Sequence, residues 1–112
     1  MKGQHLILDV YNITDVKKIE TVEEIEILMI KIIGKLDLTV VNECSKQFSP
    51  IGATILYLLA ESHLSVHTFP ESNKICLDLY CCNDKTNLYD AMDIVYHFFN
   101  GNFVLYKKII DR

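Results

Sequence analysis

Residues 53–82 read ATILYLLAESHLSVHTFPESNKICLDLYCC and contain three β-rich runs separated by two short segments of turn-forming residues. The runs are residues 53–60, 64–69 and 74–82. The separating segments are Glu61-Ser62-His63 and Pro70-Glu71-Ser72-Asn73. Each run has the length of an ordinary strand, and short turns join neighbouring antiparallel strands. This stretch therefore predicts three adjacent strands of a mostly antiparallel sheet.

The sequence before this stretch predicts one helix between two further strands. Apolar residues at helical spacing indicate a helix over residues 22–33. Thr21 and Glu24 have the spacing of a capping box, and Gly34 is a plausible C-terminal cap. The additional β-rich runs of the chain are residues 5–13, 38–43 and 103–110.

The sequence after this stretch predicts a second amphipathic helix, which Asn87 and Asp90 open and Gly101 ends. The element order is then β-α-β-β-β-β-α-β. It predicts an α+β fold, a two-layer sandwich in which two helices pack on one face of a mostly antiparallel sheet. No Pro/Gly/Ser-rich linker interrupts residues 1–112, so we expect a single domain.

Composition excludes several classes of protein. The chain has 112 residues, of which 50% are hydrophobic and 23% charged, as in ordinary globular proteins. Eleven Lys and Arg against fifteen Asp and Glu give a net charge of −4, so nucleic acid is not an expected partner. No apolar run reaches the ~18 residues of a membrane span, and no secretory signal is visible. The four cysteines form no CxxC pair, so we expect reduced thiols in a cytoplasmic protein.

Potentially reactive side chains are concentrated in the second of the three runs, residues 64–69. Because side chains alternate along a strand, Ser65, His67 and Phe69 are expected on one face, and Leu64, Val66 and Thr68 on the other. A Ser and a His on one face, with a thiol from the run 74–82, could form a nucleophile, a base and an acid. The same pattern also suits an imidazole that is hydrogen-bonded in a half-buried sheet.

A zinc site is the other reading of these residue types. His63 and His67 are four residues apart in a strand, so their rings would lie more than about 12 Å apart at a rise of ~3.3 Å per residue. We therefore expect no metal.

Three motifs together resemble the prokaryotic S-adenosylmethionine decarboxylases, a pyruvoyl-dependent family. They are FSPIGAT at 48–54, LAESHLSVHTFPE at 59–71 and DLYCC at 78–82. The resemblance covers essentially the whole chain. It implies that the chain cuts itself between Glu61 and Ser62, and that Ser62 becomes an N-terminal pyruvoyl group. The products would be residues 1–61, the β chain, and residues 62–112, the α chain.

The resemblance also implies a role for each catalytic side chain. His67 would be the processing base that removes the serine α-proton, and Thr54 would supply a hydroxyl that supports processing. In turnover the pyruvoyl carbonyl would form a Schiff base with the substrate amine. Cys82 would be the proton donor to the substrate α-carbon after decarboxylation, whereas Cys81, on the opposite face of its strand, would only pack.

Substrate binding follows from the same resemblance. Phe48 would stack on the adenine, Glu71 would accept hydrogen bonds from the ribose hydroxyls, and Phe69 stands where the family usually has Trp. The product would be decarboxylated S-adenosylmethionine, the aminopropyl donor of spermidine biosynthesis. Family members of this size resemble half of the larger eukaryotic enzyme and form homodimers whose sites draw on both protomers.

Three departures from the family lie beside this pocket: Lys46 replaces a common His, Phe69 replaces Trp, and Asn83 replaces Gly. Sister enzymes keep the self-cleavage but decarboxylate L-ornithine or L-arginine, so these remain alternative substrates. A non-enzymatic partner subunit that has lost processing is a further alternative. It would predict loss of Ser62, His67 or Cys82, and all three are present.

Overall fold

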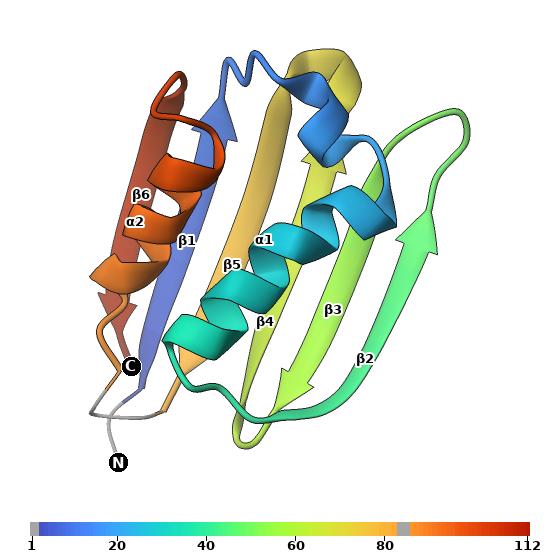
Figure 1. Cartoon of the computed structure of the whole chain (residues 1–112). Helices are drawn as coiled ribbons and strands as arrows, with labels where there is room; N and C mark the ends of the chain where they lie inside the picture. The colour runs from blue at the N-terminus through green and yellow to red at the C-terminus, as the bar shows by residue number, and fades with distance from the viewer. Residues whose placement is uncertain (1–2, 83–85) are drawn as a thin grey trace.

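The computed structural model describes residues 3–82 and 86–112 and contains one six-stranded sheet (Figure 1). The strands are β1 (Gln4–Tyr11), β2 (Val40–Gln47), β3 (Ala53–Leu59), β4 (Ser62–Phe69), β5 (Lys74–Cys81) and β6 (Val104–Asp111). The helices are α1 (Val22–Lys35) and α2 (Tyr89–Phe98), with short 3-10 helices η1 (Val16–Ile19) and η2 (Pro70–Ser72). The strand order is β2-β3-β4-β5-β1-β6, and every neighbouring pair is antiparallel. Both helices cover the same face of the sheet, which confirms the predicted α+β sandwich.

Alternation along the central strands separates a buried face from an uncovered one. In β4, Leu64, Val66 and Thr68 are buried beneath the helices, whereas His67 and Phe69 are exposed, as the sequence pattern predicts. The buried face packs against apolar side chains of α1 and α2, namely Ile25, Leu28, Met29, Ile32, Ala91, Met92 and Val95. Among the described residues no helix covers the opposite face (Figure 1), and the candidate catalytic side chains other than Ser62 lie on this face or at its ends.

Helix α1 starts as predicted but ends later. The Thr21 hydroxyl accepts a hydrogen bond from the amide of Glu24 at 3.2 Å, which confirms the N-terminal cap. The prediction that Gly34 caps the helix is wrong, because α1 continues to Lys35. Leu36 is buried and its amide donates to the Ile32 carbonyl, so packing carries the helix past Gly34.

Several strand boundaries differ from the sequence prediction. The strand predicted for residues 38–43 is β2, Val40–Gln47, and the strand predicted for 5–13 ends at Tyr11. The predicted break over residues 61–63 is also wrong, because β4 already begins at Ser62. Every side chain of β2 is exposed, so this edge strand has no apolar alternation that would mark its ends.

Helix α2 has the predicted start and stop signals. The Asn87 side chain accepts a hydrogen bond from the amide of Tyr89 at 3.0 Å. At the other end Gly101 has φ 68°, a left-handed conformation that glycine adopts readily, and its amide donates to the Tyr96 carbonyl at 2.8 Å.

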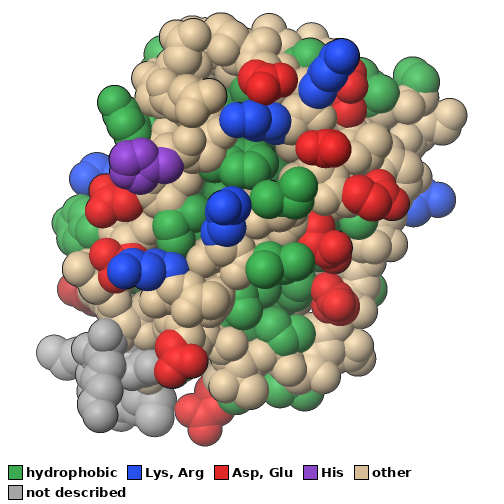
Figure 2. Space-filling model, viewed as in Figure 1, with side chains coloured by type: hydrophobic (Ala, Val, Ile, Leu, Met, Phe, Trp, Pro, Cys, Tyr) green, Lys and Arg blue, Asp and Glu red, His purple; other side chains and the backbone are tan. Residues whose placement is uncertain are grey.

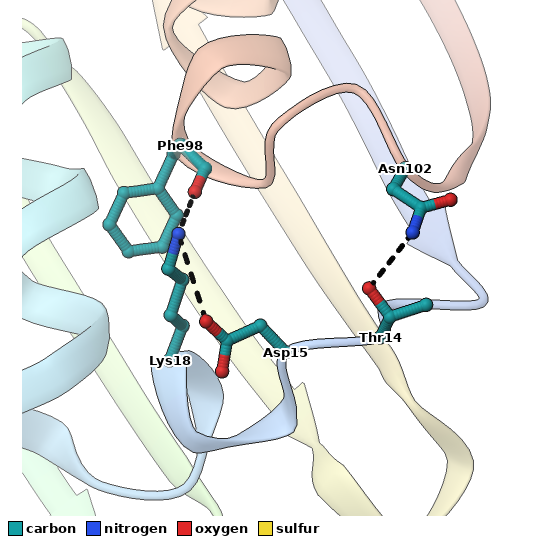
Figure 3. A network of polar contacts seen from close by, with 5 residues as sticks. All are labelled: Thr14, Asp15, Lys18, Phe98 and Asn102. Atoms are coloured by element: carbon teal, nitrogen blue, oxygen red, sulfur yellow. Dashed lines mark hydrogen bonds and ion pairs between the residues drawn. The ribbon is translucent and has the colours of Figure 1, made fainter.

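Two polar contacts tie the β1–α1 connection to the end of α2 (Figure 3). The Lys18 ammonium donates to the Phe98 carbonyl and lies 4.0 Å from a carboxylate oxygen of Asp15. The Asn102 side-chain amide donates to the Thr14 hydroxyl at 3.2 Å. These contacts hold the β1–α1 connection against the end of α2 at one end of the sandwich.

Acidic and basic side chains are interspersed on the helix-covered face of the molecule (Figure 2). This mixture is what the polar sides of two amphipathic helices present to water. Within residues 3–82 and 86–112, neither helix is long and apolar enough to cross a membrane.

The buried side chain of Tyr57 allows a test of how an unpaired hydroxyl in the core affects stability. Its side chain is 4% exposed and its hydroxyl has no hydrogen-bond partner within the described residues. We expect Tyr57→Phe to raise the free energy of unfolding by about 1 kcal/mol, because an unpaired buried hydroxyl is costly. Urea denaturation at neutral pH measures this change, and a clear loss of stability would contradict it.

The ionisation of Tyr57 adds a pH dependence to the same test. Burial, followed by the charges of Glu26 and Glu43, raises the pKa of Tyr57 to about 12 from about 10. The folded chain therefore holds this proton more tightly than the unfolded chain does. Ionisation of Tyr57 leaves the free energy of unfolding unchanged below pH ~10 and lowers it as the pH rises towards ~12. Tyr57→Phe should flatten that alkaline loss.

Candidate active site

A pocket of about 310 Å³ lies where β3 begins and β4 ends. Its lining residues are Phe48, Ile51, Gly52, Thr54, His67, Thr68, Phe69 and Glu71. Five of them are residues that the motifs single out: Phe48, Thr54, His67, Phe69 and Glu71. The structure thus brings the predicted nucleoside-binding residues and the predicted processing base around one cavity.

Thr54 and His67 form a hydrogen-bonded pair inside this pocket. They are directly opposite each other in the β3–β4 ladder, and the Thr54 Oγ1 lies 2.9 Å from the His67 Nδ1. This contact orients the imidazole and leaves its Nε2 available for proton transfer. The pair is the arrangement expected of a general base held by a hydroxyl.

We expect Thr54→Val to slow self-cleavage about 2- to 10-fold, because one neutral hydrogen bond contributes about 0.5–1.5 kcal/mol. Thr54→Ser keeps the hydroxyl and is the matched control. The measurement is the rate at which the fragment 62–112 appears by mass spectrometry. Equal rates for Thr54→Val and the unaltered chain would show that the hydroxyl has no part in processing.

Gln47 holds the loop that carries Phe48, and the sequence patterns did not identify it. Its side-chain amide donates to the carbonyls of Glu20, Phe48 and Gly52 at 3.0–3.1 Å. Its carbonyl oxygen accepts from the amide of Val22, the first residue of α1, at 2.7 Å. One side chain therefore joins the pocket rim to the start of a helix, through contacts between residues 25 and 27 positions apart.

The loop and the η2 turn complete the rim of the pocket. Gly52 has φ 114°, which other residues adopt only with strain, and its amide donates to the Glu20 carbonyl at 2.8 Å. Phe69 is exposed on the uncovered face, and the Lys74 ammonium lies 5.5 Å from its ring centroid. A cationic substrate would therefore share this ring with a lysine. Glu71 is exposed in the first turn of η2.

The predicted cleavage bond lies at the far end of β4. Ala60 and Glu61 form the turn between β3 and β4, and Leu59 pairs with Ser62 across it. Glu61 has φ 67°, a left-handed conformation that costs energy for a residue with a side chain. Backbone strain is therefore present at the residue that precedes Ser62.

Cys82 lies at the same end of the sheet as Ser62. It follows the last residue of β5, and the β4–β5 register pairs His63 with Tyr80, so Ser62 comes opposite Cys81 and next to Cys82. Cys81 is buried under the helices and Cys82 is partly exposed, as predicted for opposite faces. Asn83, one of the departures from the family, lies outside the described residues.

The resemblance assigns catalytic roles to Ser62, His67 and Cys82. These three residues do not lie close together within one chain. Ser62 and His67 are five residues apart on one strand, which separates them by about 16 Å at ~3.3 Å per residue. One end of the sheet therefore carries Thr54 and His67, and the other end carries Ser62 and Cys82. Sequence spacing alone did not reveal this division.

Cys76 is the thiol nearest to His67 in the ladder, yet its chemistry differs from that of a proton donor near neutral pH. Cys76 pairs directly with His67 in the β4–β5 register. Burial, followed by a hydrogen bond to Asp9 and the charge of Asp9, raises the pKa of Cys76 to about 11. A thiol that holds its proton this tightly is a weak acid in turnover.

Comparisons with known proteins point to one family. The family model described as S-adenosylmethionine decarboxylase matches residues 4–111. An S-adenosylmethionine decarboxylase proenzyme of Aquifex aeolicus is 41% identical over 93 residues, which is 83% of this chain and 68% of that protein. A proenzyme of the same name from Picrophilus torridus is 38% identical over 107 residues, which is 96% of this chain and 82% of that protein.

Solved structures agree with these sequence matches. The crystal structure of the adenosylmethionine decarboxylase from Aquifex aeolicus superposes with a TM-score of 0.87 at 35% identity, covering 98% of this chain and 89% of that one. The Trypanosoma brucei AdoMetDC monomer has a TM-score of 0.57 at 14% identity, over 88% of this chain and 42% of that one. The second match is a likeness of fold alone.

Proposed function

Because the chain belongs to the S-adenosylmethionine decarboxylase family, we propose that it decarboxylates S-adenosylmethionine with a pyruvoyl group made from its own Ser62. The observation that carries this proposal is the pocket in which the hydrogen-bonded Thr54–His67 pair lies beside Phe48 and Glu71. The product is decarboxylated S-adenosylmethionine, an aminopropyl donor for spermidine biosynthesis.

Self-processing starts at the strained turn. The Ser62 hydroxyl attacks the carbonyl carbon of Glu61, the peptide C–N bond breaks, and an ester joins the two halves. His67 then takes the α-proton of residue 62, and the ester oxygen leaves with the new carboxylate of Glu61. The dehydroalanine that remains at position 62 tautomerises to an imine, and water hydrolyses this imine, which releases ammonia and leaves the pyruvoyl group. The left-handed Glu61 supports this step, because cleavage releases its strain.

The residues around the site suit the group and its substrate. The pyruvoyl group supplies an electrophilic carbonyl that accepts the electrons released when carbon dioxide leaves. Phe48 offers a ring for the adenine to stack on, and the Glu71 carboxylate accepts hydrogen bonds from the ribose hydroxyls. Cys82 gives its thiol proton to the substrate α-carbon after carbon dioxide has left.

The division of the site between two ends of the sheet supports a homodimer. A two-fold axis lying across the strands would bring the Thr54–His67 end of one protomer to the Ser62–Cys82 end of its partner. The uncovered face offers apolar side chains for such a contact, since Leu56 is 44% and Leu58 is 54% exposed. A fully active monomer in sedimentation equilibrium would contradict this arrangement.

The four cysteines support a cytoplasmic location. Cys44, Cys76, Cys81 and Cys82 are all free thiols in the structure. A thiol that must donate a proton needs a reducing compartment, and the cytoplasm provides one.

The substrate test is carbon dioxide release from carboxyl-labelled S-adenosylmethionine, ornithine and arginine, with Phe48→Ala as the diagnostic variant. We expect release from S-adenosylmethionine alone. Loss of base stacking, about 1–3 kcal/mol, should raise KM about 5- to 150-fold in Phe48→Ala. Tyr89→Ala, which removes a similarly exposed ring from α2, is the matched control and should leave KM unchanged.

Other outcomes of this test identify the alternatives. Preferential release from ornithine or arginine, with Phe48→Ala harmless, would identify a sister enzyme in which Phe48 only packs. No release from any of the three substrates, with the chain intact, would identify a non-enzymatic partner subunit.

A further inference from the structure

Lys74 lies between two aromatic rings at the rim of the pocket. It is the first residue of β5 and pairs directly with Phe69, the last residue of β4. Strand β5 lies between β4 and β1 (Figure 1). The Lys74 ammonium is 5.5 Å from the centroid of the Phe69 ring and 5.3 Å from that of the Tyr11 ring on β1. Because an ammonium is attracted to the face of an aromatic ring, these two contacts hold the charge of Lys74 beside the pocket.

The turn before Lys74 fixes the start of β5. Pro70 is buried, and the amide of Asn73 donates to the Pro70 carbonyl at 3.1 Å. The carbonyl of Asn73 accepts from the amide of Ile13 at 3.0 Å, which joins this turn to the segment after β1. The position of Lys74 relative to Phe69 is therefore set by backbone hydrogen bonds on both sides.

The ammonium of Lys74 forms no ion pair with any described residue. The ion pairs of residues 3–82 and 86–112 lie elsewhere, between His5 and Asp78 and between Lys18 and Asp15. On β1, the Asp9 carboxylate accepts a hydrogen bond from the Tyr11 hydroxyl at 3.4 Å, and Glu71 lines the pocket. Lys74 thus adds an unpaired positive charge next to Phe69, which lines the same pocket.

Decarboxylation changes the charge of the bound nucleoside. S-adenosylmethionine carries a positive sulfonium, a positive ammonium and a negative carboxylate. Loss of carbon dioxide removes the carboxylate and a proton takes its place on the α-carbon, so the product has both positive charges and no negative one. The adenine that stacks on Phe48 and the ribose that contacts Glu71 are the same in both molecules. A fixed positive charge beside the pocket therefore raises the free energy of the bound product more than that of the bound substrate.

We propose that Lys74 is a specificity-determining residue that weakens binding of the doubly positive product relative to the substrate, an inference that rests on the proposed function. The Lys74 ammonium repels the sulfonium of either molecule at the Phe69 ring. It attracts the carboxylate, which only the substrate has. The pocket therefore releases the product more readily than it would if it bound the two nucleosides equally.

The test compares a charged with an uncharged nucleoside on the processed enzyme. Calorimetry gives the dissociation constants of decarboxylated S-adenosylmethionine and of 5′-methylthioadenosine, an uncharged thioether of adenosine. We expect Lys74→Met to bind the charged product about 2- to 10-fold more tightly, because one like charge near the ligand is removed. Its affinity for the uncharged thioether should stay the same. The KM for S-adenosylmethionine should fall by a smaller factor than the dissociation constant of the product.

Three further variants separate charge from shape. Lys74→Gln is a second neutral variant and should behave as Lys74→Met does. Lys74→Arg keeps the positive charge and should bind the product as the unaltered chain does. Lys107→Met is the matched control, because the Lys107 ammonium lies 5.1 Å from the centroid of the Tyr89 ring on α2, on the helix-covered side of the sheet. It should change neither dissociation constant.

Two results overturn the proposal while the proposed function stands. One is an unchanged affinity for the product in Lys74→Met and Lys74→Gln. The other is an equal gain of affinity for the charged and the uncharged nucleoside, because Lys74 would then act only on the shape of the pocket. If the unaltered chain releases no carbon dioxide from S-adenosylmethionine and binds neither nucleoside, the proposed function fails, and the role of Lys74 fails with it.

Discussion

Mass spectrometry of the purified protein is expected to show two chains, residues 1–61 and residues 62–112, while Ser62→Ala remains one chain of 112 residues. Ser62 supplies the only hydroxyl adjacent to the Glu61 carbonyl in the turn, so its removal should abolish cleavage completely. The fragment 62–112 should begin with a pyruvoyl group and resist N-terminal sequencing.

Ser65→Ala is the matched control, because Ser65 lies on the same strand but away from the turn. It should cleave normally. His67→Ala should stall at or before the ester, and hydroxylamine, which attacks esters, should then release the two fragments if the stall follows ester formation. An unaltered chain that stays intact on long incubation would refute self-processing.

Co-expression of two variants that cannot cleave alone, Ser62→Ala and His67→Ala, should restore self-cleavage. Ser62→Ala and His67→Ala are each expected to remain intact as homodimers. When they are co-expressed, every mixed dimer has one complete site, formed by Ser62 of the His67→Ala chain and His67 of the Ser62→Ala chain. This expectation follows from the separation of about 16 Å between the two residues within one chain.

The identity of the cleaved fragment makes this experiment decisive. The fragment 62–112 that appears should carry the His67→Ala substitution. Co-expression of His67→Ala with a chain that carries both substitutions is the control and should give no cleavage. If neither mixture cleaves while the unaltered chain does, then Ser62 and His67 act within one protomer and the two-protomer site is wrong.

The sequence correctly predicted the faces of strands that are buried on one side and exposed on the other. Strand β4 is central and covered on one side, so its pattern correctly assigned Ser65, His67 and Phe69 to one face. Strand β2 lies at the edge with every side chain exposed, and its predicted bounds were wrong because burial imposed no pattern on it. Gly34 failed as a helix end because a tertiary contact of Leu36 outweighed a local signal.

In the candidate site, too, the sequence predicted the residues that lie in motifs but not the contacts between residues far apart in the chain. The motifs identified Phe48, Thr54, His67, Phe69 and Glu71, and the structure gathers them around one pocket. The role of Gln47 could not be predicted, because its hydrogen bonds reach residues 25 and 27 positions away. The placement of Ser62 far from His67 likewise depends on β4 being one continuous strand, which the predicted break had obscured.

The most direct test of the central claim follows one preparation of the unaltered chain as it matures. Carbon dioxide release from carboxyl-labelled S-adenosylmethionine is measured beside the fraction of chain that has been cleaved before residue 62. We expect the rate of release to rise in proportion to that fraction, and to be absent in Ser62→Ala. Release of labelled carbon dioxide by the intact Ser62→Ala chain, at the rate of the cleaved protein, would contradict the account.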